Sequence, residues 1–222
     1  VRLEDLTGLK SCGRRADGMM ITKELNYFNI AQICDSGQCF RMRQKRDNLY
    51  SVIAGNEYLE VTQNGGQCTF HCDENKYETF WKKYFDLNTD YIESIDEEDS
   101  YLKKASEFGF GIRILRQDLW EMIVSFLISQ QNNIVRIRRC IDNICERYGE
   151  KRSDGCGNFY YTFPTAEVLA ELHEDALKDC NLGYRSKYVV RTAKSLAKGE
   201  VSLEAIKQMP YREAKAELMK LY

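Results

Sequence analysis

The sequence predicts an α+β fold, with a small antiparallel sheet in its first half and a set of helices in its second half. Residues 49–72 form short runs rich in Val, Ile, Tyr, Thr and Phe that are separated by Gly/Asn pairs, which is typical of an antiparallel meander. The apolar period becomes helical at Asp73, and beyond about residue 100 no strand is expected. We therefore predict a sheet domain over residues 1–105 and a helical domain over residues 106–222.

The composition is that of a globular protein. Of 222 residues, 43% are hydrophobic and 12% aromatic, which is enough to bury a core without disulfide bonds. The nine cysteines are an odd number and favour reduced thiols. The apolar stretch 119–128 is far shorter than the ~18 residues of a spanning helix, and Val1 opens no signal-peptide pattern. We expect an intracellular protein whose start has been trimmed, without a membrane partner.

We expect neither a metal nor a cofactor. Cys68, His71 and Cys72 form the one cluster of potential zinc ligands. A zinc site normally takes four ligands, often from paired cysteines, and the only other histidine is His173. A strand that carries two small apolar thiols is therefore the favoured interpretation.

Strands are expected over residues 49–54, 58–63 and 67–72, with a preceding strand over 40–46. Asp73 then stands where it can cap a helix. Five aromatic residues follow at helical spacing, and we expect them to pack on the sheet: Tyr77, Phe80, Trp81, Tyr84 and Phe85.

Residues 86–99 hold seven acidic residues and no basic one, which makes this stretch the best linker candidate. Asp118 is placed to cap a helix over 119–128 that is apolar nearly all round, as a buried central helix is. Periodicity resumes at Ile134 and ends at Gly149. Three more helices are expected to begin near Thr165, Gly183 and Pro210.

A polar run, Ser129–Asn133, separates two of these helices. An ordinary loop is the simpler interpretation, and the basic surplus of residues 134–152 and 183–222 is equally typical of solvated helix faces. However, Arg136 follows the run, and Leu182–Arg185 again places an aromatic residue and an arginine at a helix start. Such amide, guanidinium and phenol groups bind base edges, bases and phosphates. Together the two clusters predict a nucleic-acid site.

Four segments resemble the 8-oxoguanine DNA glycosylase family of the helix-hairpin-helix glycosylases, in that family's order: Ser36–Arg41, Gly111–Asp118, Ser125–Ile137 and Leu182–Val189. The resemblance runs from about residue 22 to residue 222. It implies a twisted antiparallel sheet with helices (TBP-like), followed by an all-helical glycosylase domain that is incomplete here. It also implies base-excision repair, with duplex DNA that carries 8-oxoguanine opposite cytosine as the partner.

The resemblance assigns roles to four residues of the helical half. An enzyme that cuts a base from duplex DNA must extrude the base and recognise the orphaned partner. Gln131 aligns with the residue that fills the vacated gap. Arg136 and Arg185 align with the two arginines that donate to the orphaned cytosine. Tyr184 aligns with the wedge that intrudes next to it.

Gly37 aligns with the residue whose backbone carbonyl accepts a hydrogen bond from N7–H of 8-oxoguanine. Guanine has a lone pair at N7 instead, so the carbonyl attracts one base and repels the other. One such bond is worth about 1–3 kcal/mol. A residue without Cβ allows main chain to approach a ligand closely. From the residues alone, a turn after Asp35 is the simpler interpretation.

The family's catalytic lysine and aspartate follow a helix that resembles residues 211–222, so neither has a counterpart up to Tyr222. We expect the chain to be a fragment with DNA and opposite-base contacts, without a catalytic residue. Two alternatives are a glycosylase of the same superfamily that acts on alkylated bases, and a non-catalytic DNA-binding module. Gly37 and the Tyr184-Arg185 pair argue against the first.

Borohydride trapping on a duplex that contains 8-oxoguanine opposite cytosine tests the expected absence of a nucleophile. The lyase reaction proceeds through a Schiff base between a lysine amine and C1′ of the sugar. We expect no covalent adduct from the 222-residue chain. An adduct would mean that the nucleophile lies among these residues.

Overall fold

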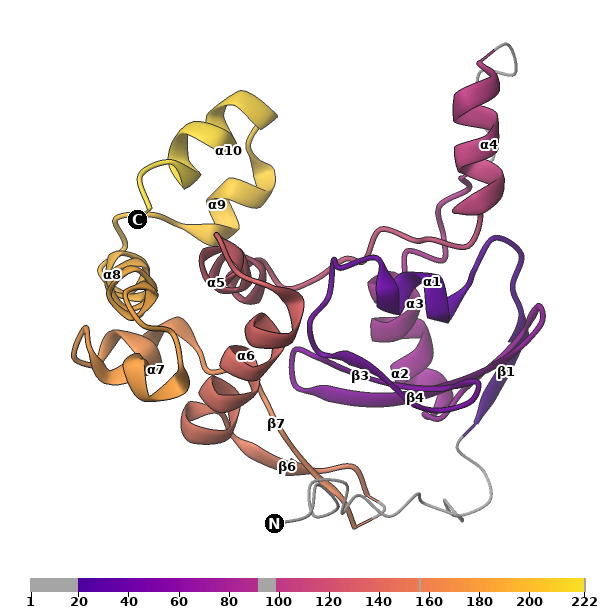
Figure 1. The fold of residues 1–222 in the computed structure, drawn as a ribbon, viewed down its shortest axis with the longest axis horizontal. Coiled ribbons are helices and arrows are strands. Elements are labelled where there is room, and N and C mark those ends of the chain that lie inside the picture. The colour runs from indigo at the N-terminus through magenta and orange to yellow at the C-terminus, as the bar shows by residue number, and fades with distance from the viewer. Residues whose placement is uncertain (1–19, 92–98, 156, 222) are drawn as a thin grey trace. The chain divides into compact units, whose positions relative to one another are not determined.

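The computed structural model describes residues 20–91, 99–155 and 157–221 (Figure 1). The chain forms two compact units. Unit 1 contains the described residues up to Ile53 together with Glu57–Arg116 and Lys151–Tyr160, and unit 2 contains Ala54–Asn56, Gln117–Glu150 and the residues from Tyr161 onward. The domain boundary after residue 105 stays a prediction.

Unit 1 is built on a five-stranded sheet with the strand order β1-β5-β4-β3-β2. Its strands are β1 (Ile21–Glu24), β2 (Met42–Arg46), β3 (Leu49–Ala54), β4 (Glu57–Asn64) and β5 (Gln67–Phe70). Strand β5 pairs antiparallel with both β1 and β4, so that Phe70 lies opposite Ile21 on one side and Val61 on the other. The predicted meander is confirmed, and the prediction missed β1.

The helical segment after the sheet begins where predicted. The carboxylate of Asp73 accepts a hydrogen bond from the Lys76 amide at 2.8 Å. The segment comprises α2 (Glu74–Lys76), a π-helical turn η1 (Tyr77–Trp81) and α3 (Lys82–Tyr84). The Tyr77 ring lies 5.0 Å from that of Phe70 in β5, and Phe85 lies 5.9 Å from Phe70. The aromatic face therefore packs on the sheet, as expected (Figure 1).

A buried arginine joins the loops of unit 1. The Arg113 guanidinium donates to four main-chain carbonyls in two separate loops, those of Asn26, Tyr27, Asp86 and Thr89, at 2.7–3.4 Å. Tyr27 and Asp86 have left-handed backbones, with φ of 54° and 51°. Gly111 lies close by, and a Cβ there would stand 2.2 Å from Cβ of Asn29. The segment 111–113 is therefore an integral part of unit 1.

The first residues of the predicted acidic linker are structured. Asp86 is buried and accepts hydrogen bonds from Thr89, Tyr91 and Arg116 at 2.9, 2.7 and 3.1 Å. Burial alone would raise the pKa of this carboxyl group, but these donors outweigh it and hold the pKa below its usual value. The prediction of a linker is wrong for residues 86–91, and residues 92–98 lie outside the described part of the chain.

Unit 2 is helical. Its helices are α5 (Leu119–Ser129), α6 (Ile134–Tyr148), α7 (Ala166–Ala170), the 3-10 helix η2 (Ala176–Cys180), α8 (Arg185–Ala197), α9 (Leu203–Gln208) and α10 (Tyr211–Leu218). The predicted caps are confirmed: Asp118 accepts from the Glu121 amide at 2.9 Å and Thr165 from that of Val168 at 3.4 Å. No helix of the described residues is both long and apolar enough to cross a membrane.

Several elements differ from the expectation. The expectation of no strand beyond residue 100 is wrong, because β6 (Lys151–Ser153) pairs with β7 (Phe159–Tyr161). Each has three residues, too few for a recognisable alternation. Two helices of unit 1 were also missed, α1 (Ile30–Asp35) and α4 (Ser100–Phe108).

The Asp86 cluster predicts a specific dependence of stability on pH. A carboxyl group whose pKa is lowered by folding stabilises the protein at pH values above its unfolded-state pKa. This contribution is lost as the pH falls through the lower pKa of the folded state. We expect Asp86→Asn to lower the free energy of unfolding by about 1–3 kcal/mol at neutral pH. The difference from wild type should begin to shrink near the ordinary value of 3.8 and should be lost as the pH falls further, through the lowered pKa of the folded protein. Urea unfolding across pH measures it, and parallel pH profiles of the two proteins would contradict the assignment.

Candidate nucleic-acid interface

The loop between α5 and α6 has a defined conformation. Gln130 ends α5, and Gln131 has a left-handed backbone with φ of 49°. The Asn132 amide donates to the Ser129 carbonyl at 3.1 Å. The Asn133 side chain then caps α6 by accepting from the Arg136 amide at 2.9 Å. The polar run is therefore a C-terminal turn followed by an N-terminal cap.

Arg185, the first residue of α8, is buried with only 5% of its surface exposed. Its Nε and Nη2 donate to the Gln130 carbonyl at 3.1 and 2.5 Å, and Nη2 also donates to the Gln131 carbonyl at 3.1 Å. These bonds join residues that are more than fifty positions apart in sequence. The guanidinium thus ties the start of α8 to the polar loop.

Tyr184 lies directly against this arginine. Its ring centroid is 4.6 Å from Cζ of Arg185, which is a cation–π distance, and 6.2 Å from the Tyr188 ring. The side chain nevertheless remains 54% exposed. An exposed aromatic ring beside a guanidinium is suited to stacking on a base or intruding into a base stack.

Arg136 is exposed in the first turn of α6. Its Nη2 approaches the carbonyl of Asn181 at 3.4 Å, and the thiol of Cys140 approaches the same oxygen at 3.4 Å. Asn181 has a left-handed backbone with φ of 65° and stands three residues before Tyr184. Burial raises the pKa of the Cys140 thiol, and this effect outweighs the lowering by the neighbouring guanidinium groups. Cys140 is therefore a neutral core group.

Unit 2 contains four of the predicted site residues: Gln131, Arg136, Tyr184 and Arg185. Direct contacts join Gln131, Arg185 and Tyr184, whereas Arg136 contacts Asn181, three residues before Tyr184. Gly37 lies in unit 1, in the turn that follows α1, with φ of 78°. The side chain of the neighbouring Gln38 donates to the Arg113 carbonyl at 2.8 Å and accepts from the Leu115 amide at 2.9 Å. A Cβ at Gly37 would meet no atom within 4 Å, so its backbone conformation, and not crowding by the protein, calls for glycine.

Three residues of the network were not assigned a role from the sequence. Gln130 contributes the carbonyl that Arg185 binds, Asn133 caps α6, and Asn181 supplies the carbonyl near Arg136. Asn133 had a usable signal, because asparagine immediately before a helix is a common N-cap. Backbone carbonyls carry no signal in a sequence.

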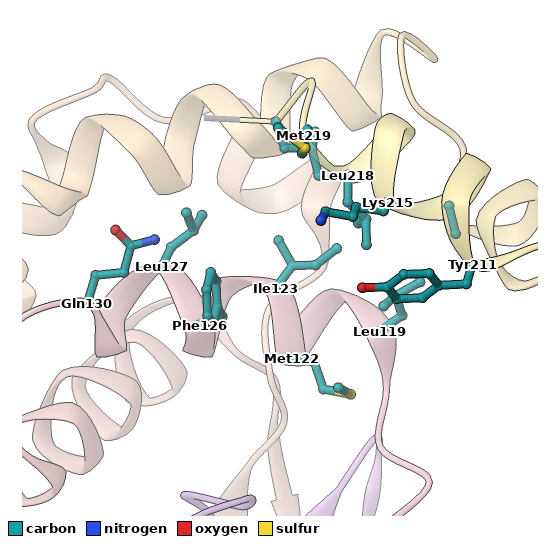
Figure 2. Close-up of a pocket in the computed structure, with 12 residues that line it drawn as sticks. Leu119, Met122, Ile123, Phe126, Leu127, Gln130, Tyr211, Lys215, Leu218 and Met219 are labelled. Carbon is teal, nitrogen blue, oxygen red and sulfur yellow. The ribbon is translucent and has the colours of Figure 1, made fainter.

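Helix α5 is buried on one face only. Its inward residues are Trp120, Val124 and Ile128. The opposite face lines an apolar groove of about 650 Å³ together with α10. In Figure 2, Leu119, Ile123 and Phe126 of α5 stand across the groove from Tyr211, Lys215 and Leu218 of α10. The expectation of a helix buried all round is therefore wrong, since apolar composition does not say which face the remaining structure covers.

Cys68, His71 and Cys72, the cluster of potential zinc ligands, lie in β5 and directly after it. Cys68 and Cys72 are buried, and Nε2 of His71 lies 3.0 Å from the Thr62 hydroxyl. Burial raises the pKa of the Cys68 thiol to about 12, which disfavours the thiolate that metals bind. Over residues 20–91, 99–155 and 157–221 no group of three His, Cys, Asp or Glu side chains could hold a metal ion.

Two family models match the chain in succession. Residues 20–123 match the 8-oxoguanine DNA glycosylase N-terminal domain. Residues 124–219 match the HhH-GPD superfamily base excision DNA repair protein model.

Individual relatives agree with these matches. An N-glycosylase/DNA lyase of Saccharomyces cerevisiae is 29% identical over 208 residues, which cover 83% of this chain and 54% of the relative. The apo 8-oxoguanine glycosylase/lyase of Clostridium acetobutylicum is 37% identical with a TM-score of 0.86, over 92% of this chain and 73% of that one. Its complex with duplex DNA containing cytosine opposite 8-oxoguanine is 38% identical over the same shares, with a TM-score of 0.84. The chain thus spans about half the length of the curated relatives it matches.

The groove predicts unequal costs for two truncations on α5. Ile128 is fully buried, whereas Phe126 is 66% exposed. We expect Ile128→Ala to lower the free energy of unfolding by about 2–5 kcal/mol, and Phe126→Ala by less than about 1 kcal/mol. Urea unfolding of the 222-residue chain measures both. Equal losses would show that the Phe126 side chain is covered in solution.

Proposed function

The chain belongs to the 8-oxoguanine DNA glycosylase family of the HhH-GPD superfamily, and on this basis we propose that its parent protein removes 8-oxoguanine opposite cytosine from duplex DNA. The reaction class is that of an N-glycosylase/lyase in base-excision repair, as the names of its relatives indicate. The match of residues 20–123 to the N-terminal domain of 8-oxoguanine DNA glycosylase favours this substrate over alkylated bases. A DNA substrate also implies an intracellular location.

The observation that carries the proposal is the network around Arg185. A glycosylase must fill the gap left by the extruded base and bind the base that has lost its partner. Unit 2 presents an amide side chain at Gln131 and a ring at Tyr184, and one guanidinium contacts both residues. These groups have the shapes that gap filling and wedging require.

We assign recognition of the orphaned cytosine to Arg136 and Arg185. Cytosine offers its O2 and N3 as acceptors once it is unpaired, and a guanidinium carries several N–H donors in one plane. Arg136 is exposed, and its contact with the Asn181 carbonyl, at 3.4 Å, is weak enough to be exchanged for a base. Nη1 of Arg185 makes no hydrogen bond to the described residues, so it is the nitrogen available for this contact.

We assign recognition of the lesion to the carbonyl of Gly37. The left-handed backbone at this position is held by the Gln38 side chain, which binds both Arg113 and Leu115. A carbonyl fixed in this way can distinguish N7–H of 8-oxoguanine from the N7 lone pair of guanine. The gain of about 1–3 kcal/mol is modest, so base extrusion must supply further selectivity.

Binding to a stable abasic-site analogue separates opposite-base recognition from the chemistry. We expect the 222-residue chain to bind the analogue opposite cytosine more tightly than opposite adenine. Arg136→Ala should reduce this preference by roughly 5- to 100-fold, because a good guanidinium–base contact is worth about 1–3 kcal/mol of discrimination. Fluorescence anisotropy at fixed ionic strength measures the dissociation constants.

Arg139→Ala is the matched control, because Arg139 is also exposed on α6 and its substitution removes the same charge. It should weaken binding to both duplexes equally, as the loss of a general phosphate attraction does. An unchanged preference for cytosine in Arg136→Ala would exclude the role of Arg136. No preference in the wild-type chain would contradict opposite-base recognition by these residues.

A further inference from the structure

We infer that Arg185 is a positioning residue that presets the gap-filling loop before DNA binds, and that this role is separate from any contact with the opposing base. The inference rests on the proposed function for the identity of the ligand. The structural evidence is independent of it. Of the guanidinium nitrogens, Nε and Nη2 are bound to the Gln130 and Gln131 carbonyls.

The loop has a conformation that needs such support. Gln131 is a residue with a Cβ in the left-handed region, with φ of 49°. This backbone is unfavourable for residues other than glycine, and persists only when the surroundings hold it. The two carbonyls that Arg185 binds flank this strained position, since one belongs to the preceding residue and the other to Gln131 itself. The arginine therefore compensates the strain at the point where it arises.

The geometry of the guanidinium is essential to this role. Three donations to two carbonyls need N–H groups in a fixed plane, whereas a lysine ammonium is a point charge on a flexible stem. The same plane lies over the Tyr184 ring at 4.6 Å. Arg185 thereby contacts both the proposed wedge, Tyr184, and the proposed gap filler, Gln131.

Presetting the loop has a thermodynamic consequence. A binding loop that is already ordered loses less conformational entropy on association. Gap filling by Gln131 occurs whichever base stands opposite, so the benefit of presetting should be the same for every opposing base. A direct contact with cytosine benefits the cytosine duplex alone. This difference makes the positioning role measurable.

The first test needs no DNA. In Arg185→Lys, we expect amide hydrogen exchange in residues 130–133 to accelerate by roughly 10- to 100-fold, because charge-assisted hydrogen bonds that hold the loop are lost. Arg136→Lys is the matched control, since this arginine has no bond to the loop carbonyls and should leave loop exchange unchanged. Unchanged loop exchange in Arg185→Lys, or an equal acceleration in the cores of α7 and α8, would overturn the inference.

A second measurement covers the case in which Arg185→Lys folds poorly. Glycine adopts a left-handed backbone without strain. In a Gln131→Gly background, Arg185→Lys should therefore lower the melting temperature less than it does in the wild-type background. Equal decreases in both backgrounds would mean that Arg185 does not compensate the strain at Gln131.

The third test uses the abasic-site analogue. Arg185→Lys should weaken binding to the analogue opposite adenine by about 10-fold, with the intact duplex bound as before, whereas Arg136→Lys should weaken binding opposite cytosine only. If Arg185→Lys weakens binding only to the analogue opposite cytosine, Arg185 is a direct contact with that base and the positioning role is overturned. If the wild-type chain binds the analogue no more tightly than the intact duplex, the proposed function fails. The amide hydrogen exchange experiment then still decides whether Arg185 holds the loop.

Discussion

The hydrogen bonds from buried guanidinium groups to main-chain carbonyls are the interaction on which both units depend. In unit 2, Arg185 binds the carbonyls around left-handed Gln131. In unit 1, Arg113 binds those of Tyr27 and Asp86, which are also left-handed. A buried charge is costly unless its donors are satisfied, and a loop carbonyl without a partner is costly as well. Each arginine removes both costs at once.

This constraint explains why the candidate interface lies at helix ends that are rigid. Residues 130–133 have no regular structure, yet their backbone is held by the Asn133 cap on one side and Arg185 on the other. Polar side chains in such a segment can point outward without the entropy that a free loop would lose on binding. A flexible loop with the same composition would offer the same chemistry at lower affinity.

Local patterns were predictable from the sequence, and long-range ones were not. The caps at Asp73 and Asp118 and the strand Leu49–Ala54 follow from signals within a few residues. The bonds of Arg185 connect residues more than fifty positions apart, and an arginine in a sequence usually indicates an exposed side chain. The sequence also did not predict which face of α5 lines the groove, because apolar periodicity shows which residues could be buried and not which ones the rest of the chain covers.

The two kinds of recognition in the proposed function belong to different units. The residues assigned to the opposing base lie in unit 2, and the carbonyl assigned to the lesion lies at Gly37 in unit 1. Binding energy for the orphaned cytosine therefore does not require the lesion carbonyl, so affinity for an abasic site and selectivity for 8-oxoguanine are separable quantities. The modest energy of a single carbonyl contact makes this division useful, because contacts to the opposing base can stabilise the extruded state while Gly37 selects among the bases that reach it.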